Sequence, residues 1–407
     1  MKKLLQTSAL LCASALILSG CSSNTDKNNK PIETTEIIEE TTEVELPVET
    51  TEVQKTEPTT EIKISDDEEQ TNIIDYQKYY DNMLIMGSDN PKMIYSPVSL
   101  NTALDTYSCM IGQNEAFDEI RSFIGNINYR RYHDVMDSDT GVYRIINRIW
   151  VNENKDVTLD DCSVIRSYVY SMDMSDSKAA TNEKNQYVSD MTDGFIKSTP
   201  TIFDNNTVTD VMNIVYFKDV WLDGDLKMTE DTYDFNNYDD SVSSVNMMMY
   251  SNDFYYENDT CYVIPMNYST GMTFYAIYPK TDVESVDLTD IFDNKVFDDV
   301  DIKLPEFETE VTIGVTDYAD SIGLSHFDEC IPLYYDGSVD NEITQVAKIK
   351  VDHTGTEAAA VTEIITKSMS AMPGETLELV FDKPFAYMIE DVNGDIAFIG
   401  RVMTLNQ

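Results

Sequence analysis

The sequence predicts a large α+β domain that follows an export signal and a polar tether. Apolar residues recur at helical spacing early in the domain, whereas strand-like runs dominate its later part. The chain has 407 residues, of which 42% are hydrophobic, and this is enough to bury a large core. Because no second break in composition follows the tether, we expect one domain over residues 73–407.

Residues 1–21 have the features of a lipoprotein signal peptide. Two lysines precede an apolar run over residues 4–18, which is too short and wrongly flanked for a membrane-spanning helix. Leu18-Ser19-Gly20-Cys21 resembles the lipobox of bacterial lipoproteins, in which the cysteine receives diacylglycerol and cleavage occurs just before it. We therefore expect an exported lipoprotein held at the outer face of a bacterial membrane through Cys21. An ordinary cleaved signal is the alternative.

Residues 22–72 form the predicted tether. Thr, Glu, Pro, Ser and Asn dominate this stretch, which carries fifteen acidic residues and four lysines and has no aromatic residue. With no apolar periodicity, nothing in it can drive collapse into a core. We expect a disordered, acidic tether.

Within the domain, the first helix is expected to begin near Ile73, where apolar residues recur at helical spacing up to Leu84. A short strand over 93–95 follows, and Pro97 is expected to open a second helix. Asn393-Gly394 is typical of a hairpin turn. Strand-like runs lie at Tyr143–Val151, Met212–Phe217, Ser244–Tyr250, Cys261–Met266, Thr273–Tyr278, Val300–Leu304, Ile343–Val351, Leu377–Phe381, Ala386–Glu390 and Ile396–Val402.

Charge and composition exclude several function classes. Asp and Glu number 74 against 28 Lys and Arg, a formal net charge of −46, so the chain repels nucleic acid and we expect no such partner. No GxSxG, HExxH, P-loop or GxGxxG pattern occurs, and the three histidines lie in unrelated contexts. We expect no enzyme activity, no catalytic residue, no cofactor and no metal. The cysteines at 109, 162, 261 and 330 are interpreted as buried thiols, with disulfides as the alternative in an exported protein.

The segment from Gly355 to Pro373 is the most informative part of the sequence. It begins with a glycine and small residues, as an exposed loop would, and then alternates with a period of two. Such alternation, with every charge on one side, is what a strand with one buried face requires, so the segment suits both states. One face carries Thr356, Ala358, Ala360, Thr362, Ile364 and Thr366, and the other carries Glu357, Ala359, Val361, Glu363, Ile365 and Lys367.

These residues resemble the hinge of inhibitory serpins. The hinge match is Gly355, Thr356, Glu357, Ala358, Ala359, Ala360, Val361 and Thr362, and residues 379–385 resemble the family signature after its reactive loop. Further matches follow in order across about 73–404, at residues 95–99, 186–196, 213–221, 302–307, 323–325 and 399–402. The resemblance implies a serpin fold, with helices packed on three β-sheets and an exposed reactive loop near the C-terminus.

The resemblance also implies a mechanism. A serine-type protease, with a cysteine protease as a further candidate, attacks the exposed loop and forms an acyl-enzyme. The cleaved loop then enters the main sheet as a new strand and traps the protease in a covalent complex, so the native fold is expected to be metastable. We expect the inhibitor to act as a monomer. A non-inhibitory serpin-fold binding protein is the alternative.

Spacing in the family places the cleaved bond about fourteen residues after the hinge glycine, at Met369–Ser370. A long apolar Met suits chymotrypsin-like, elastase-like or subtilisin-like pockets. Cleavage after Lys367 by a trypsin-like protease, or after Met372, are the alternatives.

The resemblance also implies a hydrogen-bonded shutter beneath the main sheet, formed by Ser96, Ser99, Asn213 and Gln345. Animal members usually have histidine at the last of these positions. Because glutamine can both donate and accept, we expect the shutter to persist without a histidine's pH response.

Overall fold

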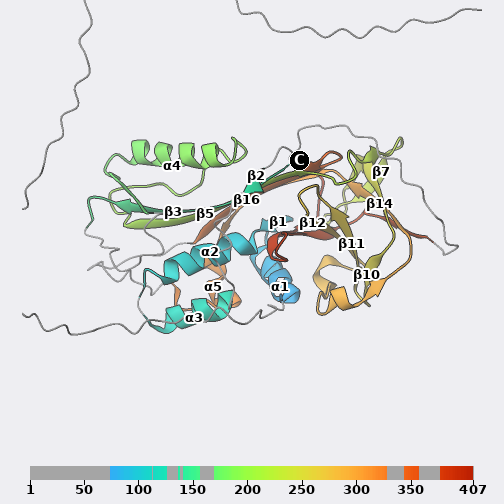
Figure 1. The fold of residues 1–407 in the computed structure, drawn as a ribbon, viewed down its shortest axis with the longest axis horizontal. Coiled ribbons are helices and arrows are strands. Elements are labelled where there is room, and N and C mark those ends of the chain that lie inside the picture. The colour runs from blue at the N-terminus through green and yellow to red at the C-terminus, as the bar shows by residue number, and fades with distance from the viewer. Residues whose placement is uncertain are drawn as a thin grey trace, which may run out of the picture. The chain divides into compact units, whose positions relative to one another are not determined.

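The computed structural model describes residues 74–111, 113–125, 136–137, 141–155, 169–327, 343–356 and 376–406. In this part of the chain, helices and three main β-sheets build one compact unit (Figure 1). The predicted fold class is confirmed. Among the described residues, no helix has the length and apolar character needed to cross a membrane.

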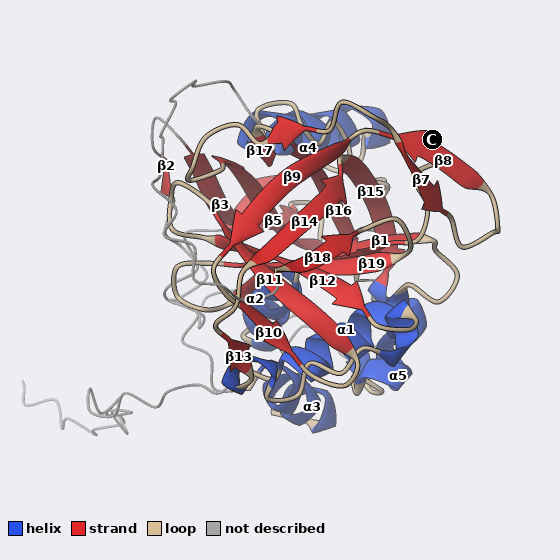
Figure 2. Cartoon of the chain, turned by 90° about the vertical axis from the view of Figure 1, so that its right-hand side faces the viewer, coloured by secondary structure: helices blue, strands red, loops and turns tan. Residues whose placement is uncertain are grey.

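Five α-helices are described, and most of them lie in the first part of the domain. They are α1 (Tyr76–Met86), α2 (Pro97–Ser108), α3 (Glu115–Ile124), α4 (Ser177–Met191) and the short α5 (Ala319–Ile322). The predicted start of α2 is confirmed, because Pro97 is its first residue and the Ser96 hydroxyl caps it by accepting from the Ser99 amide. Helices α1, α3 and α5 gather at one end of the unit (Figure 2).

Sheet I forms the apolar centre of the molecule. Its seven strands are, in spatial order, β1 (Lys92–Tyr95), β20 (Ile396–Val402), β19 (Phe385–Glu390), β12 (Thr273–Pro279), β11 (Cys261–Asn267), β10 (Tyr255–Glu257) and β13 (Lys295–Val296). Every residue of β20 is buried, so the strand is covered on both faces. The hairpin predicted at Asn393-Gly394 joins β19 to β20, and Gly394 adopts a φ of 86° there.

Two further sheets complete the architecture. Sheet II has four strands in the order β18 (Leu377–Val380), β14 (Val300–Pro305), β9 (Met247–Asn252) and β6 (Lys227–Met228). Sheet III runs in the order β15 (Phe307–Gly314), β16 (Thr344–Asp352), β17 (Gly355–Thr356), β5 (Thr209–Val220), β3 (Gly141–Asn152) and β2 (Met136–Asp137), with β4 (Val169–Met172) also paired to β3. Helix α4 lies over one face of sheet III, and α2 lies on the other side (Figure 1).

The single strand predicted over Ser244–Tyr250 is wrong. Two strands replace it: β8 (Val242–Val245) pairs with β7 (Tyr233–Asn236) in a separate two-stranded ribbon, and β9 joins sheet II. The break falls at Asn246, whose side-chain amide donates to the Thr229 carbonyl, while the Met247 amide donates to the Thr229 hydroxyl. These side-chain bonds hold the chain in a bend that the apolar pattern does not reveal.

The two cysteines in the described part of the chain are covered to different degrees. Cys261 is fully buried in sheet I, and burial raises the pKa of its thiol to about 11. Cys109, at the end of α2, is half-buried. Cys162 and Cys330 lie outside the described residues.

Candidate functional site

Sheet III contains a two-residue strand where the predicted hinge begins. Gly355 and Thr356 form β17, which pairs with the end of β16 on one side and with the end of β5 on the other. A Cβ atom on Gly355 would lie 2.1 Å from the Asp219 carbonyl oxygen, and the residue has a φ of 149°. Only glycine fits this position. Gly355, the first residue of the predicted hinge, therefore lies within sheet III.

Below β17, the two central strands of sheet III are separated. Within the described part of the chain, β16 and β5 each pair with β17, and no pairing links them to each other. On their outer sides, β16 pairs with β15 and β5 pairs with β3 along most of their lengths. We call the space between Thr209–Lys218 of β5 and Thr344–Lys350 of β16 the slot. Its two edges can accept one further strand.

Two aromatic residues hold the top of the slot. The Tyr268 hydroxyl lies 2.6 Å from the Thr356 hydroxyl, and Thr356 is only 2% exposed. The Tyr268 ring stacks on Trp221 at 4.6 Å between centroids, and the indole nitrogen of Trp221 donates to the Asp352 carbonyl at 3.0 Å. Burial raises the pKa of Tyr268 well above its usual value, so its hydroxyl stays neutral and can donate. Thr356, the hinge residue after Gly355, therefore already lies in the sheet.

A buried carboxylate positions this tyrosine. Asp219, at the end of β5, has no exposed area and accepts bonds from the Ser269 hydroxyl at 2.6 Å, the Thr270 amide at 3.1 Å and the Thr270 hydroxyl. These bonds hold the turn after Tyr268 against the strand that faces Thr356. The sequence analysis missed both Asp219 and Tyr268, because nothing in the sequence brings residue 268 near residue 356.

The structure brings the four predicted shutter residues together beneath the slot. The Gln345 side chain accepts from the Ser96 amide at 2.9 Å and donates to the Ser96 carbonyl at 3.0 Å. The Ser99 hydroxyl donates to the Asn213 carbonyl at 3.5 Å, and the Asn213 side chain donates to Asn147 at 2.8 Å. The start of α2 is therefore bonded to both β16 and β5, one strand on each side of the slot. Their role as a shutter stays a prediction.

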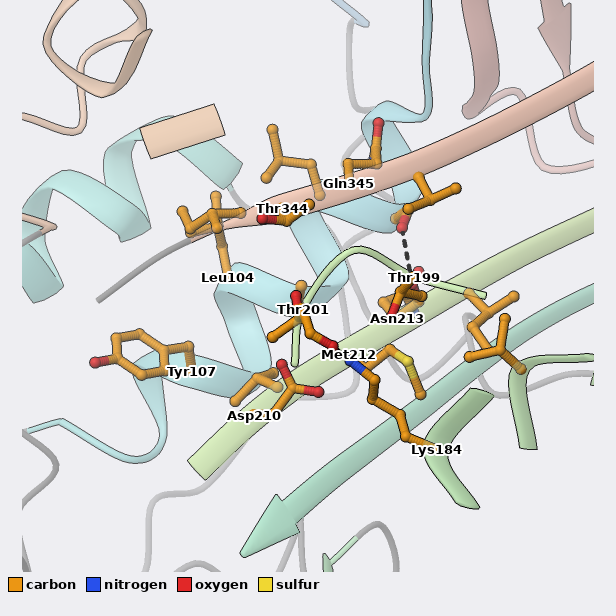
Figure 3. Close-up of a pocket in the computed structure, with 18 of the residues that line it drawn as sticks. Leu104, Tyr107, Lys184, Thr199, Thr201, Asp210, Met212, Asn213, Thr344 and Gln345 are labelled. Atoms are coloured by element: carbon orange, nitrogen blue, oxygen red, sulfur yellow. Dashed lines mark hydrogen bonds between the residues drawn. The ribbon is translucent and has the colours of Figure 1, made fainter. Parts of the chain in front are cut away.

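The lower half of the slot opens into a cavity of about 160 Å³. Its walls come from β5, β16, α2, α4 and the segment after α4 (Figure 3). The α2 wall is apolar, with Leu104 and Tyr107, whereas Lys184 of α4 and Asp210 of β5 bring charged groups. Nowhere in the described residues do three His, Cys, Asp or Glu side chains converge as a metal site needs.

Other predicted site residues lie outside the described ranges. These are the hinge residues Glu357 to Thr362, the reactive bond Met369–Ser370 with its alternatives Lys367 and Met372, and the lipidation site Cys21.

Comparisons with known proteins agree with this geometry. A family model described as "Serpin (serine protease inhibitor)" matches residues 79–405. Corticosteroid-binding globulin from Bos taurus is 24% identical over 361 residues, 79% of this chain and 86% of that protein. Neuroserpin from Rattus norvegicus is 23% identical over 366 residues, 80% of this chain and 88% of that protein. The crystal structure of the thermophilic serpin tengpin in its native state has a TM-score of 0.68 at 21% identity, covering 81% of this chain and 94% of that one.

Proposed function

Since the chain belongs to the serpin family, we propose that it inhibits a serine-type endopeptidase by inserting its cleaved reactive loop into sheet III. The family is described as serine protease inhibitors rather than as enzymes. The observation that carries the proposal is the slot, with Thr356 already paired at its top between β16 and β5. A loop that is hydrogen-bonded to both edges at its first residue needs only to continue in the same register.

We infer how much of the loop the slot accepts by continuing the register of β17. The antiparallel pairing sets Glu357 opposite Lys218 on β5, and each further residue moves one position down that strand. Thr366 then lies opposite Thr209, where β5 begins. Thr362 falls between Asn213 and Gln345, so its hydroxyl reaches the predicted shutter from the same face as the buried Thr356. Residues 357–366 therefore fill the slot, and Lys367 begins the link to the bound protease.

The chemical step is an acyl transfer that stops halfway. The hydroxyl oxygen of the protease serine attacks the Met369 carbonyl carbon, the bond to the Ser370 nitrogen breaks, and that nitrogen takes up the proton as a free amine. An ester joins Met369 to the protease. Insertion of residues 357–366 then carries this ester toward the lower end of sheet III before water can hydrolyse it.

We expect a chymotrypsin-like or subtilisin-like protease to form a covalent complex through Met369. Denaturing gels should show a band at the summed mass, and mass spectrometry should find a released peptide beginning at Ser370. A new amino terminus at residue 368 or 373 would instead assign the bond to Lys367 or Met372. Complete cleavage without any complex would contradict inhibition. It would favour a binding role, as the name of the corticosteroid-binding relative suggests for that protein.

We propose that a diacylglycerol on Cys21 anchors the inhibitor at the outer face of a bacterial membrane, with residues 22–72 as its tether. Expressed in a lipoprotein-processing bacterium, the wild-type protein should partition into detergent and incorporate labelled palmitate. Cys21→Ser should lose both properties. Retention of label by Cys21→Ser would show that this cysteine is not the acceptor, whereas Cys12→Ser is the matched control and should leave labelling unchanged.

A further inference from the structure

Four side chains share one face of the β10–β13 pair at the edge of sheet I. The antiparallel register sets Tyr256 opposite Lys295, and one further step along both strands sets Phe254 opposite Phe297. Because successive side chains alternate between the two faces of a sheet, these four point to the same side. We call the four residues the aromatic patch.

The contacts within the aromatic patch agree with this arrangement. The Lys295 ammonium lies 3.4 Å from the centroid of the Phe254 ring and 4.8 Å from that of the Phe297 ring. The Phe254 ring is nearly perpendicular to the Tyr256 ring, with 5.8 Å between their centroids. A cation over an aromatic face is attracted by the ring electrons. The lysine therefore joins the rings of the two strands into one surface.

Phe297 is the most exposed large hydrophobic residue in the described part of the chain, at 77%. Phe254 and Tyr256 are half-buried, and Lys295 is exposed. A lone exposed apolar residue is ordinary, but several aromatic rings gathered on one face are typical of an interaction surface. The described part of the fold leaves Phe297 uncovered, so a partner is needed to bury it.

The aromatic patch lies where the reactive loop rejoins the domain. The Leu377 amide, at the start of β18, donates to the Asp299 carbonyl at 2.9 Å, and Phe297 is two residues before that carbonyl. Strand β9 ends at Asn252, where it pairs with the start of β14, and Phe254 follows two residues later. Both phenylalanines thus flank the strands that receive the end of the loop.

A protease that binds the intact loop is held close to this point. Met369, whose carbonyl is the proposed point of attack, precedes Leu377 by eight residues, which span at most about 29 Å. A protease domain of about 250 residues has a radius of gyration of about 18 Å, so its body is about 45 Å wide. The surface beside its cleft, on the side that binds residues after the cleaved bond, can therefore reach the aromatic patch.

Charge around the aromatic patch indicates the chemistry of the partner surface. Asp253, Asp298 and Asp299 are exposed beside the rings, whereas the patch itself contributes the one cation of Lys295. The whole chain carries a formal net charge of −46. A complementary surface is therefore apolar at its centre and basic at its rim.

We propose that the aromatic patch is a docking site for the target protease, on the side of the protease cleft that binds residues after the cleaved bond. This inference rests on the proposed inhibitory function and adds a determinant of target choice outside the loop. Phe297 and Phe254 bury against an apolar area of the protease, and the neighbouring aspartates face basic side chains at its rim. Docking strengthens the encounter complex and leaves the later insertion step unchanged.

The test uses the full chain and proteases whose catalytic serine is replaced by alanine, so that the loop is bound but not cut. Chymotrypsin and subtilisin serve as probes because their folds are unrelated. Phe297→Ser should raise the Kd for both about fivefold or more, since it removes the exposed aromatic anchor. Phe297→Tyr keeps the ring and should bind within about twofold of the wild type.

Ile202→Ser is the matched control. Ile202 is 68% exposed and follows α4, which Figure 2 shows on the opposite side of the unit from β10 and β13. Its replacement should leave the Kd unchanged. Because Phe297 is exposed, Phe297→Ser should also leave the melting temperature unchanged, and a thermal scan checks this.

Equal dissociation constants for the wild type and Phe297→Ser with both probes would overturn the inference. With the active proteases, the number of inhibitor molecules consumed for each protease trapped should be the same for Phe297→Ser and the wild type. A changed number would mean that Phe297 acts on insertion, which would also overturn the docking role. Cleavage of the wild-type loop without any trapped protease, or no binding of the wild type to either probe, would instead contradict the proposed function itself.

Discussion

Cleavage of the reactive loop should raise the melting temperature of the protein by tens of degrees. In the intact chain, only the two residues of β17 bridge β16 and β5, and the edges below them have no ladder partner in the described residues. After cleavage, residues 357–366 can pair with both edges, and each ladder hydrogen bond contributes about 0.5–1.5 kcal/mol net. In an inserted strand Ile364 would share the buried face with Thr356, and its full burial would add about 1.5–3 kcal/mol.

We expect a large rise in melting temperature because the new hydrogen bonds and the newly buried area all belong to one strand, which forms as a unit. The slot also ends in a cavity, and Thr362, Ile364 and Thr366 would fill its apolar side against α2. Filling such a space restores contacts that the open sheet lacks. In a domain of this size, about 1 kcal/mol moves the midpoint by only about 2–4 °C, so a jump of tens of degrees requires that most of the strand forms.

Calorimetry on intact protein and on protein cleaved after Met369 decides the matter. Cleavage within residues 22–72 is the control, because it breaks the chain without freeing the loop and should leave the midpoint unchanged. Equal midpoints for intact and loop-cleaved protein would mean that no strand has formed. The insertion mechanism would then be untenable for this chain, even if covalent complexes were observed.

The sequence predicted the parts of the fold whose signal is local. The strands β12 and β16 were found because apolar or alternating residues run along their whole length. Helix α2 was found because Pro97 suits the first position of a helix. Strand β15 was missed although its buried and exposed residues alternate without a break. The alternation of apolar and polar residues that predicts β15 is present in the sequence itself.

Other features depend on contacts between distant segments and could not be read from the sequence. The bend at Asn246 is fixed by Thr229, and the seat of Thr356 is fixed by Tyr268. The sequence analysis placed all loop charges on one face of a possible strand but gave no sign of what packs on the sheet there. Helix α4 covers the lower part of one face of sheet III, because Tyr187 and Val188 pack on β5.

Thr356→Arg should abolish trapping while leaving cleavage intact. Thr356 is 2% exposed, pairs with Val351 and Asp219, and its hydroxyl lies 2.6 Å from that of Tyr268. An arginine at this position would bury a cation against an aromatic wall at a cost of several kcal/mol. Each 1.36 kcal/mol of activation free energy changes a rate tenfold, so insertion should slow by about a hundredfold or more. Hydrolysis of the acyl-enzyme should then be faster than insertion.

The expected result is complete conversion to cleaved inhibitor with active protease, followed on denaturing gels and by residual protease activity. Thr356→Ser keeps the hydroxyl and is the matched control, which should trap at the wild-type level. Because Thr356 already belongs to the intact sheet, Thr356→Arg could lower the stability of the intact protein as well, and its melting curve must be recorded. Ala358→Arg avoids that complication, since residue 358 follows β17 in the sequence and would take the inward face only if the register of β17 continues on insertion. Covalent complexes at wild-type stoichiometry with both arginine variants would refute insertion through the top of the slot.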